Sequence, residues 1–262
     1  MSKETIRQQF GANAKTYVTS KPHAKGASLQ RLVETVQPQP DWHVLDLATA
    51  AGHTALAFAP FVDRVIGLDL TPQMLPLAAD LAAERGIENL DVLAGDVDDL
   101  PFDDGQFDLV TCRIAPHHFD DIGRFLAETA RVLKPGGVFG LVDNVVPGSR
   151  LRGKKADQQR LAGRYVNAFE KLRDPSHGRC LSMNEWQDAL VAAGFDILHE
   201  ETLDKEMQFE SWAARHPADT RLRLKAALLQ APEAAADFLN PQVAGDLTSF
   251  RLREGLFVTR HG

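Results

Sequence analysis

The 262-residue chain has little cysteine and no long apolar run, and both shortages exclude classes of protein. Its two cysteines, Cys112 and Cys180, fit no disulfide framework and no zinc-ligand spacing, so we expect reduced thiols and no metal site. No stretch approaches the roughly 20 apolar residues of a membrane span, and the N-terminal segment has no apolar core of signal-peptide length. We therefore expect a cytoplasmic protein without a membrane span.

Positive charge is also scarce, because 29 Lys and Arg residues face 36 Asp and Glu residues, for a formal net charge of -7. An acidic chain is a poor match for a phosphate backbone, so we expect no nucleic-acid partner. The length and the 44% hydrophobic content suit one large domain, or a domain with a smaller lid.

Strand and helix signals alternate through the first 143 residues, a pattern typical of parallel βα units. Thr71, with Pro72 at the first helical position, is expected to cap a helix that ends at Gly86. Apolar spacing predicts a second helix from Asp121, which the KPGG segment at 134–137 should end. The strands are expected at residues 42–48, 64–70, 89–96, 107–115 and 138–143.

The pattern changes after residue 143. Ser182 and Glu185 form a capping box that should open a helix ending at Gly194, and further helix starts are expected near Pro217 and Pro232. The remaining strands are expected at residues 195–201 and 250–260. Before the capping box lies a basic, helix-capable insertion, and its cations form either a solvated helix face or a lid surface that attracts an anionic substrate. These cations are Arg150, Arg152, Lys154, Lys155, Arg160 and Arg164.

The segment VLDLATAAGH, residues 44–53, has only one glycine where nucleotide-binding loops usually have several. Ala48 and Ala50 precede Gly52 in this loop. We expect both alanines in backbone conformations that L-residues adopt readily, so that glycine at both would cost about 0.4–1 kcal/mol per site. Their methyl groups should hinder a pyrophosphate more than a thioether chain, which favours S-adenosylmethionine (SAM) over NAD.

Charged residues stand at four predicted strand ends: Asp46, Asp69, Asp96 and Arg113. Ligands of open parallel sheets bind beyond the carboxyl ends of the strands. Asp69 can accept both hydroxyls of a ribose, as acids do in NAD and in SAM sites. Asp96 can accept an adenine amino group while Val97 packs against the ring.

Four segments together resemble the class I SAM-dependent methyltransferases, within them the ubiquinone/menaquinone biosynthesis branch, although Ala48 and Ala50 depart from the family's D-x-G-x-G-x-G loop. The resemblance implies a Rossmann-like α/β fold, with a seven-stranded, mostly parallel sheet, an antiparallel last strand, helices on both faces and helical lid insertions. The segments are VLDLATAAGHTALAF (44–58), VIGLDLTPQML (65–75), AGDVDDLPFDDGQFDLVTCRIAPHHFDD (94–121) and ARVLKPGGVFGLVD (130–143).

The same resemblance implies roles for single residues. Asp46 would orient the loop and the methionine end of SAM, and Leu70 would pack the adenine. Tyr17, in an N-terminal segment at residues 10–23, would cover the methionyl group. The loop residues Ala48, Thr49, Ala50 and Gly52 would line the cofactor with backbone groups, Asp69 would bind the ribose, Asp96 and Val97 would bind the adenine edge, and Arg113 completes the cofactor-binding set.

The SAM-binding core is expected at residues 31–147, completed by 182–201 and 250–262. Residues 1–30, 148–181 and 202–249 would then form the lid and the substrate pocket. The aromatic residues of the later segments favour an apolar or aromatic acceptor, or else they pack in the core. They are Phe169, Trp186, Phe209 and Trp212.

His117 and His118 follow the fourth predicted strand, beside the place where the methyl group should emerge. Methyl transfer is an in-line displacement that depends on alignment, but an oxygen or acidic carbon nucleophile also benefits from a base. Both histidines are therefore candidate catalytic residues, although they can equally cap the next helix. His23 and His177 are further candidates.

The sequence thus predicts a SAM-dependent methyltransferase acting on a small organic acceptor, with the O-, C- or N-nucleophile left open. Two alternatives are an NAD-dependent oxidoreductase and a SAM-binding protein without turnover. Either a monomer or a homodimer is compatible with the sequence.

Overall fold

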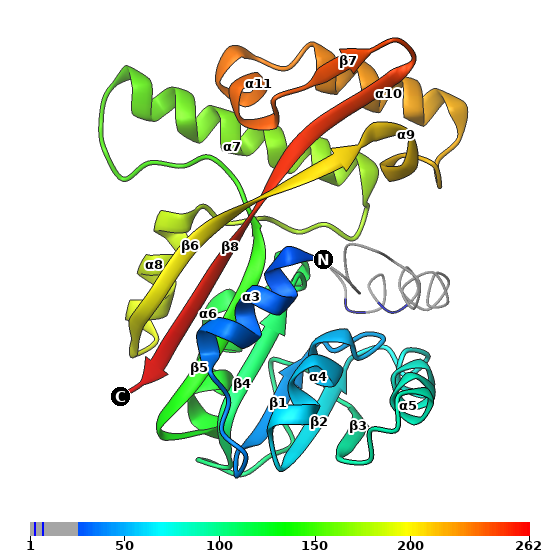
Figure 1. Cartoon of the computed structure of the whole chain (residues 1–262). Helices are drawn as coiled ribbons and strands as arrows, with labels where there is room; N and C mark the ends of the chain where they lie inside the picture. The colour runs from blue at the N-terminus through cyan, green and yellow to red at the C-terminus, as the bar shows by residue number, and fades with distance from the viewer. Residues whose placement is uncertain (1–2, 4–6, 8–25) are drawn as a thin grey trace. The chain divides into compact units, whose positions relative to one another are not determined.

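The structure is a computed structural model that describes Lys3, Arg7 and residues 26–262 (Figure 1). It divides into two compact units. The first unit comprises Met1–Asp143, Ala189–Glu201 and Leu256–Gly262, and the second comprises Asn144–Asp188 and Thr202–Gly255.

One sheet contains all the strands of the described chain, in the order β3-β2-β1-β4-β5-β8-β6, with the short β7 paired to β8. The pairs β1–β2, β1–β4, β2–β3 and β4–β5 are parallel, and the arrow of β8 in Figure 1 runs opposite to that of β5. The expected mixed sheet with an antiparallel last strand is confirmed, with β7 as an eighth strand that the sequence did not predict. The strands are β1 (His43–Leu47), β2 (Arg64–Asp69), β3 (Leu90–Ala94), β4 (Phe107–Arg113), β5 (Leu133–Val145), β6 (Phe195–Gln208), β7 (Gln242–Ala244) and β8 (Leu247–His261).

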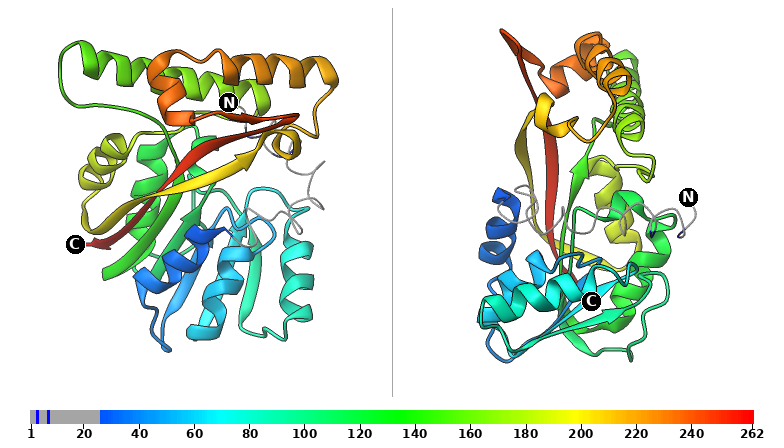
Figure 2. Two further views of the ribbon diagram at one scale, coloured as in Figure 1. Left: turned by 45° about the horizontal axis from the view of Figure 1, so that its top comes forward. Right: turned by 90° about the vertical axis from the view of Figure 1, so that its right-hand side faces the viewer.

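Helices cover both faces of the sheet in the first unit, and the right-hand view of Figure 2 shows α3 and α6 on opposite sides. In α6, Phe125, Leu126 and Val132 are buried, as the apolar spacing predicts, and the Asp121 side chain caps the helix. Among the described residues, the helices that lie wholly in this unit are α3 (Ala27–Val36), α4 (His53–Phe58), α5 (Leu75–Glu84) and α6 (Ile122–Val132), with 3-10 turns at Ala59–Phe61 and Pro116–His118.

One predicted helix start and one predicted strand start are wrong. α5 begins at Leu75 rather than after Thr71, because the Thr71 amide donates to Asp69 Oδ1 and its carbonyl accepts from Met74 in a separate turn. The first-turn proline of α5 is therefore Pro76. α6 ends at Val132, one residue before the KPGG segment as predicted, but β5 begins at Leu133 rather than at residue 138. The KPGG segment lies inside β5, where the pairing with β4 jumps from Phe107–Leu133 to Leu109–Val138, so these residues bulge out of the ladder.

The second unit has its own apolar core, built on α7 (Lys154–Arg173), α9 (Phe209–Trp212), α10 (Ala218–Leu229) and α11 (Glu233–Leu239). Phe169 and Trp212 stack with ring centroids 5.1 Å apart, and Phe209 is buried in the same cluster. Trp186 is only 1% exposed. These aromatics pack in the core, the second of the two interpretations that the sequence allows.

The predicted helix starts of this part of the chain are confirmed. The Ser182 amide donates to Glu185 Oε2 over 2.8 Å, which closes the capping box of α8 (Met183–Ala192), and Pro217 and Pro232 precede α10 and α11. β6 and β8 are longer than expected. None of the helices in the described part of the chain combines the length and the hydropathy needed to cross a bilayer.

Candidate functional site

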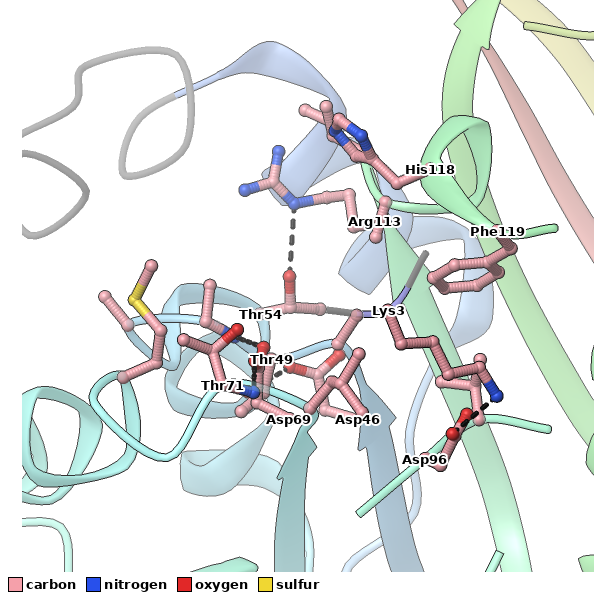
Figure 3. A pocket seen from close by; sticks show the side chains of 18 of the residues that line it. Lys3, Asp46, Thr49, Thr54, Asp69, Thr71, Asp96, Arg113, His118 and Phe119 are labelled. Atoms are coloured by element: carbon pink, nitrogen blue, oxygen red, sulfur yellow. Dashed lines mark hydrogen bonds and ion pairs between the residues drawn. The ribbon is translucent and has the colours of Figure 1, made fainter. Parts of the chain in front are cut away.

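A pocket opens at the carboxyl ends of β1, β2 and β4 and lies entirely in the first unit (Figure 3). Its volume is about 1060 Å³ with the open mouth included, the upper end of the range for small-molecule sites. Two cations, Lys3 and Arg113, and two histidines line it. Five carboxylates do so as well: Asp46, Asp69, Asp96, Asp98 and Asp120. The pocket therefore carries an excess of negative charge.

The loop after β1 turns through left-handed backbone conformations. Ala48 has φ 53°, Ala50 has φ 47° and Gly52 has φ 81°. The prediction of ordinary backbone angles at the two alanines is wrong. Both have the left-handed angles that glycine adopts easily, although both are L-residues with a Cβ. Gly52 is the N-cap residue of α4, and a Cβ on Gly52 would lie 2.9 Å from the Cβ of Ala78. Gly52 is not among the residues that line the pocket. The loop thus stores backbone strain beside the pocket.

This strain reverses the expected effect of glycine in the loop. The double variant A48G/A50G removes the left-handed penalty of about 1–2 kcal/mol per residue and adds about 0.4–1 kcal/mol of unfolded-state entropy. We expect the free energy of unfolding in urea to rise by about 1 kcal/mol in total. The control A79G, at an exposed position inside α5, should lower it by a similar amount. If A48G/A50G lost as much free energy of unfolding as A79G does, the two alanines would not be strained.

Asp46, at 1% exposure, organises the loop from within the sheet. Its Oδ2 accepts from the Thr49 hydroxyl over 2.6 Å and from the Ala55 amide over 3.2 Å, and its Oδ1 accepts from the Thr111 hydroxyl over 2.7 Å. Burial raises the pKa of Asp46 to about 6, against these hydrogen bonds and the charge of Arg113, which lower it. Asp46 therefore ties β1, its loop, α4 and β4 together.

Thr49 fixes the same loop to β2. Its amide donates to the Leu68 carbonyl over 3.0 Å. A Cβ on Gly67 would lie 2.9 Å from the Thr49 side chain. A glycine in β2 thus leaves the room that the loop side chain needs.

Asp69 ends β2, lines the pocket and contacts the loop after β1. Its Oδ2 accepts from the Ala50 amide and its Oδ1 from the Thr71 amide, each over 2.8 Å. Burial raises the pKa of Asp69, and these two amides act in the other direction. Because each carboxylate oxygen has two lone-pair sites, the group can accept further hydrogen bonds from a ligand in the pocket.

Asp96 follows β3 and has a cationic partner. Its Oδ2 accepts from Lys3 Nζ over 2.6 Å, and the same ammonium lies 2.8 Å from Asp98 Oδ2. Burial raises the pKa of Asp96, but the bonds from Lys3 and from the Asp98 amide outweigh it and hold the pKa below its usual value. An amino group that approaches Asp96 must share this carboxylate with Lys3.

The remaining wall comes from the end of β4 and the turn after it. Arg113 Nε donates to the Thr54 hydroxyl over 3.1 Å, and Figure 3 shows Arg113 and His118 across the pocket from Asp69. His117 is not among the lining residues, and its Nδ1 lies 2.6 Å from Asp143 Oδ1 at the end of β5. The two imidazole rings pack with centroids 4.2 Å apart. His118 thus faces the pocket, with a buried His117–Asp143 pair behind it.

The structure brings most of the predicted site residues together, since Leu70 and Val97 line the pocket with the residues above. Tyr17 and His23 lie outside the described residues. His177 belongs to the second unit, where its Nε2 lies 2.9 Å from Asn167 Oδ1. Sequence reasoning missed several lining residues, all of which except Lys3 stand inside the quoted motif segments without being singled out as site residues: Lys3, Ala51, His53, Thr54, Thr71, Met74, Asp98, Ile114, Ala115, Phe119 and Asp120. In the described chain, no group of three or more His, Cys, Asp or Glu side chains could hold a metal ion.

Comparison with known proteins identifies relatives of this chain. A family model described as "Methyltransferase domain" matches residues 45–141. The uncharacterised methyltransferase YcgJ of Bacillus subtilis (strain 168) is 37% identical over 235 residues, with 89% of each chain covered. The crystal structure of YcgJ matches with a TM-score of 0.79 at 35% identity, covering 89% of this chain and 97% of that one.

Two further relatives have named activities. Nocamycin O-methyltransferase of Saccharothrix syringae is 35% identical over 195 residues, 70% of this chain and 69% of its own. A demethylmenaquinone methyltransferase of Deinococcus radiodurans is 40% identical over 113 residues, 42% of this chain and 46% of its own. Fold and relatives together define a class I methyltransferase fold. The chain belongs to the methyltransferase family, and none of these relatives supports the oxidoreductase alternative.

Proposed function

We propose that the protein transfers a methyl group from SAM to a small organic acceptor. The observation that carries the proposal is the set of carboxylates at three neighbouring strand ends, Asp46, Asp69 and Asp96, on one pocket. SAM supplies an electrophilic methyl group on a sulfonium and has a net positive charge at neutral pH. A pocket with five carboxylates against two cations favours such a ligand on electrostatic grounds.

The lining residues match the polar groups of SAM. Asp69 has the acceptor capacity for the two ribose hydroxyls, and Asp96 has it for the adenine amino group. Leu70 and Val97 provide apolar surface for the adenine ring. Arg113 is the guanidinium placed to pair with the carboxylate of the methionyl end, and the strained loop at Ala48–Gly52 provides backbone groups nearby.

His118 is the candidate base of the reaction. An acceptor O–H, N–H or acidic C–H forms a bond to the methyl carbon, the carbon–sulfur bond breaks with its electrons going to sulfur, and the acceptor proton passes to His118. His117 would act through His118 as a positioning residue, because Asp143 holds its Nδ1 and its ring packs on His118. Alignment in a pocket shielded from water supplies the rest of the rate enhancement.

We assign the SAM-binding core to residues 31–147, 182–201 and 250–262, and acceptor binding to the segments at 1–30, 148–181 and 202–249. The relatives named above include an O-methyltransferase and a quinone-type methyltransferase, which supports a small-molecule acceptor.

Two measurements test this function. Calorimetry should show binding of SAM and of S-adenosylhomocysteine to the full chain, with NADH as the negative control. SAM labelled in its methyl group, incubated with the protein and a cell extract, should transfer label to a small metabolite that mass spectrometry identifies. Absence of SAM binding would refute the cofactor assignment. Binding without any labelled product would instead favour a SAM-binding protein without turnover.

A further inference from the structure

A second pocket lies entirely in the second unit and shares no lining residue with the pocket at the strand ends. Its walls are one face of α7, the segment at residues 146–150 and the start of α8 with the residues before it. Its volume is about 1020 Å³, open mouth included. Four arginines line it: Arg150, Arg160, Arg164 and Arg179.

Close backbone packing builds this pocket. A Cβ on Gly163 of α7 would lie 2.1 Å from the Pro147 carbonyl oxygen, and a Cβ on Gly148 would lie 2.4 Å from the Ser182 side chain. Asn167 holds the segment before α8, because its Nδ2 donates to the Cys180 carbonyl and its Oδ1 accepts from the Cys180 amide. Close packing at two glycines and the hydrogen bonds of Asn167 therefore hold the walls in place.

Three of the four arginines have a carboxylate partner. Arg150 binds Asp188 with a closest distance of 2.7 Å, and Arg179 is paired with Glu185, the acid of the capping box. Arg160 pairs with Asp157 and also donates to the carbonyls of Ser149 and Leu151 over 2.8 and 2.9 Å. The guanidinium groups are thus oriented around the pocket.

Arg164 is the exception, because no described residue makes a hydrogen bond or ion pair with its side chain. It lies one turn after Arg160 on the same face of α7, and like charges four residues apart weaken a helix. An anion between the two would remove this repulsion. Arg164 therefore carries the one positive charge of the four arginines that no described carboxylate compensates. The other three guanidinium groups are held in place by their partners.

We propose that this pocket binds a small molecule through an oxyanion, a phosphoryl or a carboxyl group, with Arg164 as its anchor. The planar guanidinium donates pairs of parallel hydrogen bonds to either group. The inference does not depend on the proposed methyl transfer, since no lining residue is shared between the two pockets.

The test compares R164Q with R221Q. Arg221 is an exposed arginine of α10 outside the pocket, so both variants lose one charge from the second unit. Thermal unfolding of the full chain is followed while inorganic phosphate or acetate is titrated, each against sodium chloride of the same ionic strength. Wild type and R221Q should gain melting temperature with one or both probes, and the apparent Kd of R164Q should be about tenfold weaker.

The two probes separate the two chemistries. A response to phosphate alone identifies a phosphoryl ligand, and a response to acetate alone identifies a carboxyl ligand. The proposal is overturned if neither probe acts beyond sodium chloride, or if R164Q responds as wild type does. Without a probe, R164Q should unfold at the wild-type temperature or slightly above it, because Arg164 makes no bond in the described chain and the variant removes its repulsion with Arg160.

Discussion

The H118Q variant is expected to transfer methyl groups with a kcat about 10²–10⁴-fold below that of wild type, the usual contribution of a general base. Glutamine keeps most of the imidazole volume and a hydrogen-bonding end but cannot take the acceptor proton at neutral pH. Turnover is measured with the acceptor that the labelling experiment identifies. The Kd for SAM should change little, because His118 lies across the pocket from Asp69.

A matched control separates the chemistry from a general effect of losing a histidine. His43 is exposed and contacts Asp63, away from the pocket, so H43Q should keep the wild-type kcat. If H118Q stays within about threefold of wild type while binding SAM normally, alignment alone drives the reaction and His118 is not a base.

The second large effect is expected at Asp69, where D69A should weaken SAM binding about 10–150-fold, the loss of hydrogen bonds to a charged acceptor worth about 1.5–3 kcal/mol. The structure adds a loss of stability, because alanine leaves the amides of Ala50 and Thr71 without their acceptor. D69N, which keeps one acceptor oxygen, should lose affinity with a smaller loss of melting temperature.

D91A is the control for this measurement. Asp91 is an exposed carboxylate on the neighbouring strand β3, where it pairs with Arg64 outside the pocket. Calorimetric titration with SAM should give D91A the wild-type Kd. An unchanged Kd in folded D69N and D69A would remove the ribose assignment.

Local patterns were enough to predict much of the fold. The apolar spacing of α6 and the capping box at Ser182 involve neighbours within four residues, so the sequence alone predicts both elements. The start of α5 was missed because Thr71 is engaged by Asp69, a side chain two residues earlier that stops the turn from continuing as a helix. The extra length of β6 comes from its neighbour β8, which lies far away in the sequence, and the added first residues of β8 pair with the adjacent strand β7, which was not predicted.

The candidate site was predictable where a residue ends a strand, because the carboxyl ends of parallel strands meet at one edge. Asp46 shows the limit of this reasoning. Its partner Thr111 is 65 residues away, so the hydrogen bond that fixes it has no sequence signal. Lys3 was missed for the same reason, being 93 residues from Asp96. The left-handed angles of Ala48 and Ala50 were missed because alanine gives no sign of them.

The division into units has a consequence for protein engineering. The chain passes between the units after Asp143, Asp188, Glu201 and Gly255, and each of these points lies inside β5, α8, β6 or β8 rather than in a linker. Cutting the second unit out would therefore sever three strands and one helix, and each cut strand would expose an unpaired end. Chimeras with a relative should exchange whole strands together with the helices between them, so that no junction falls within an element.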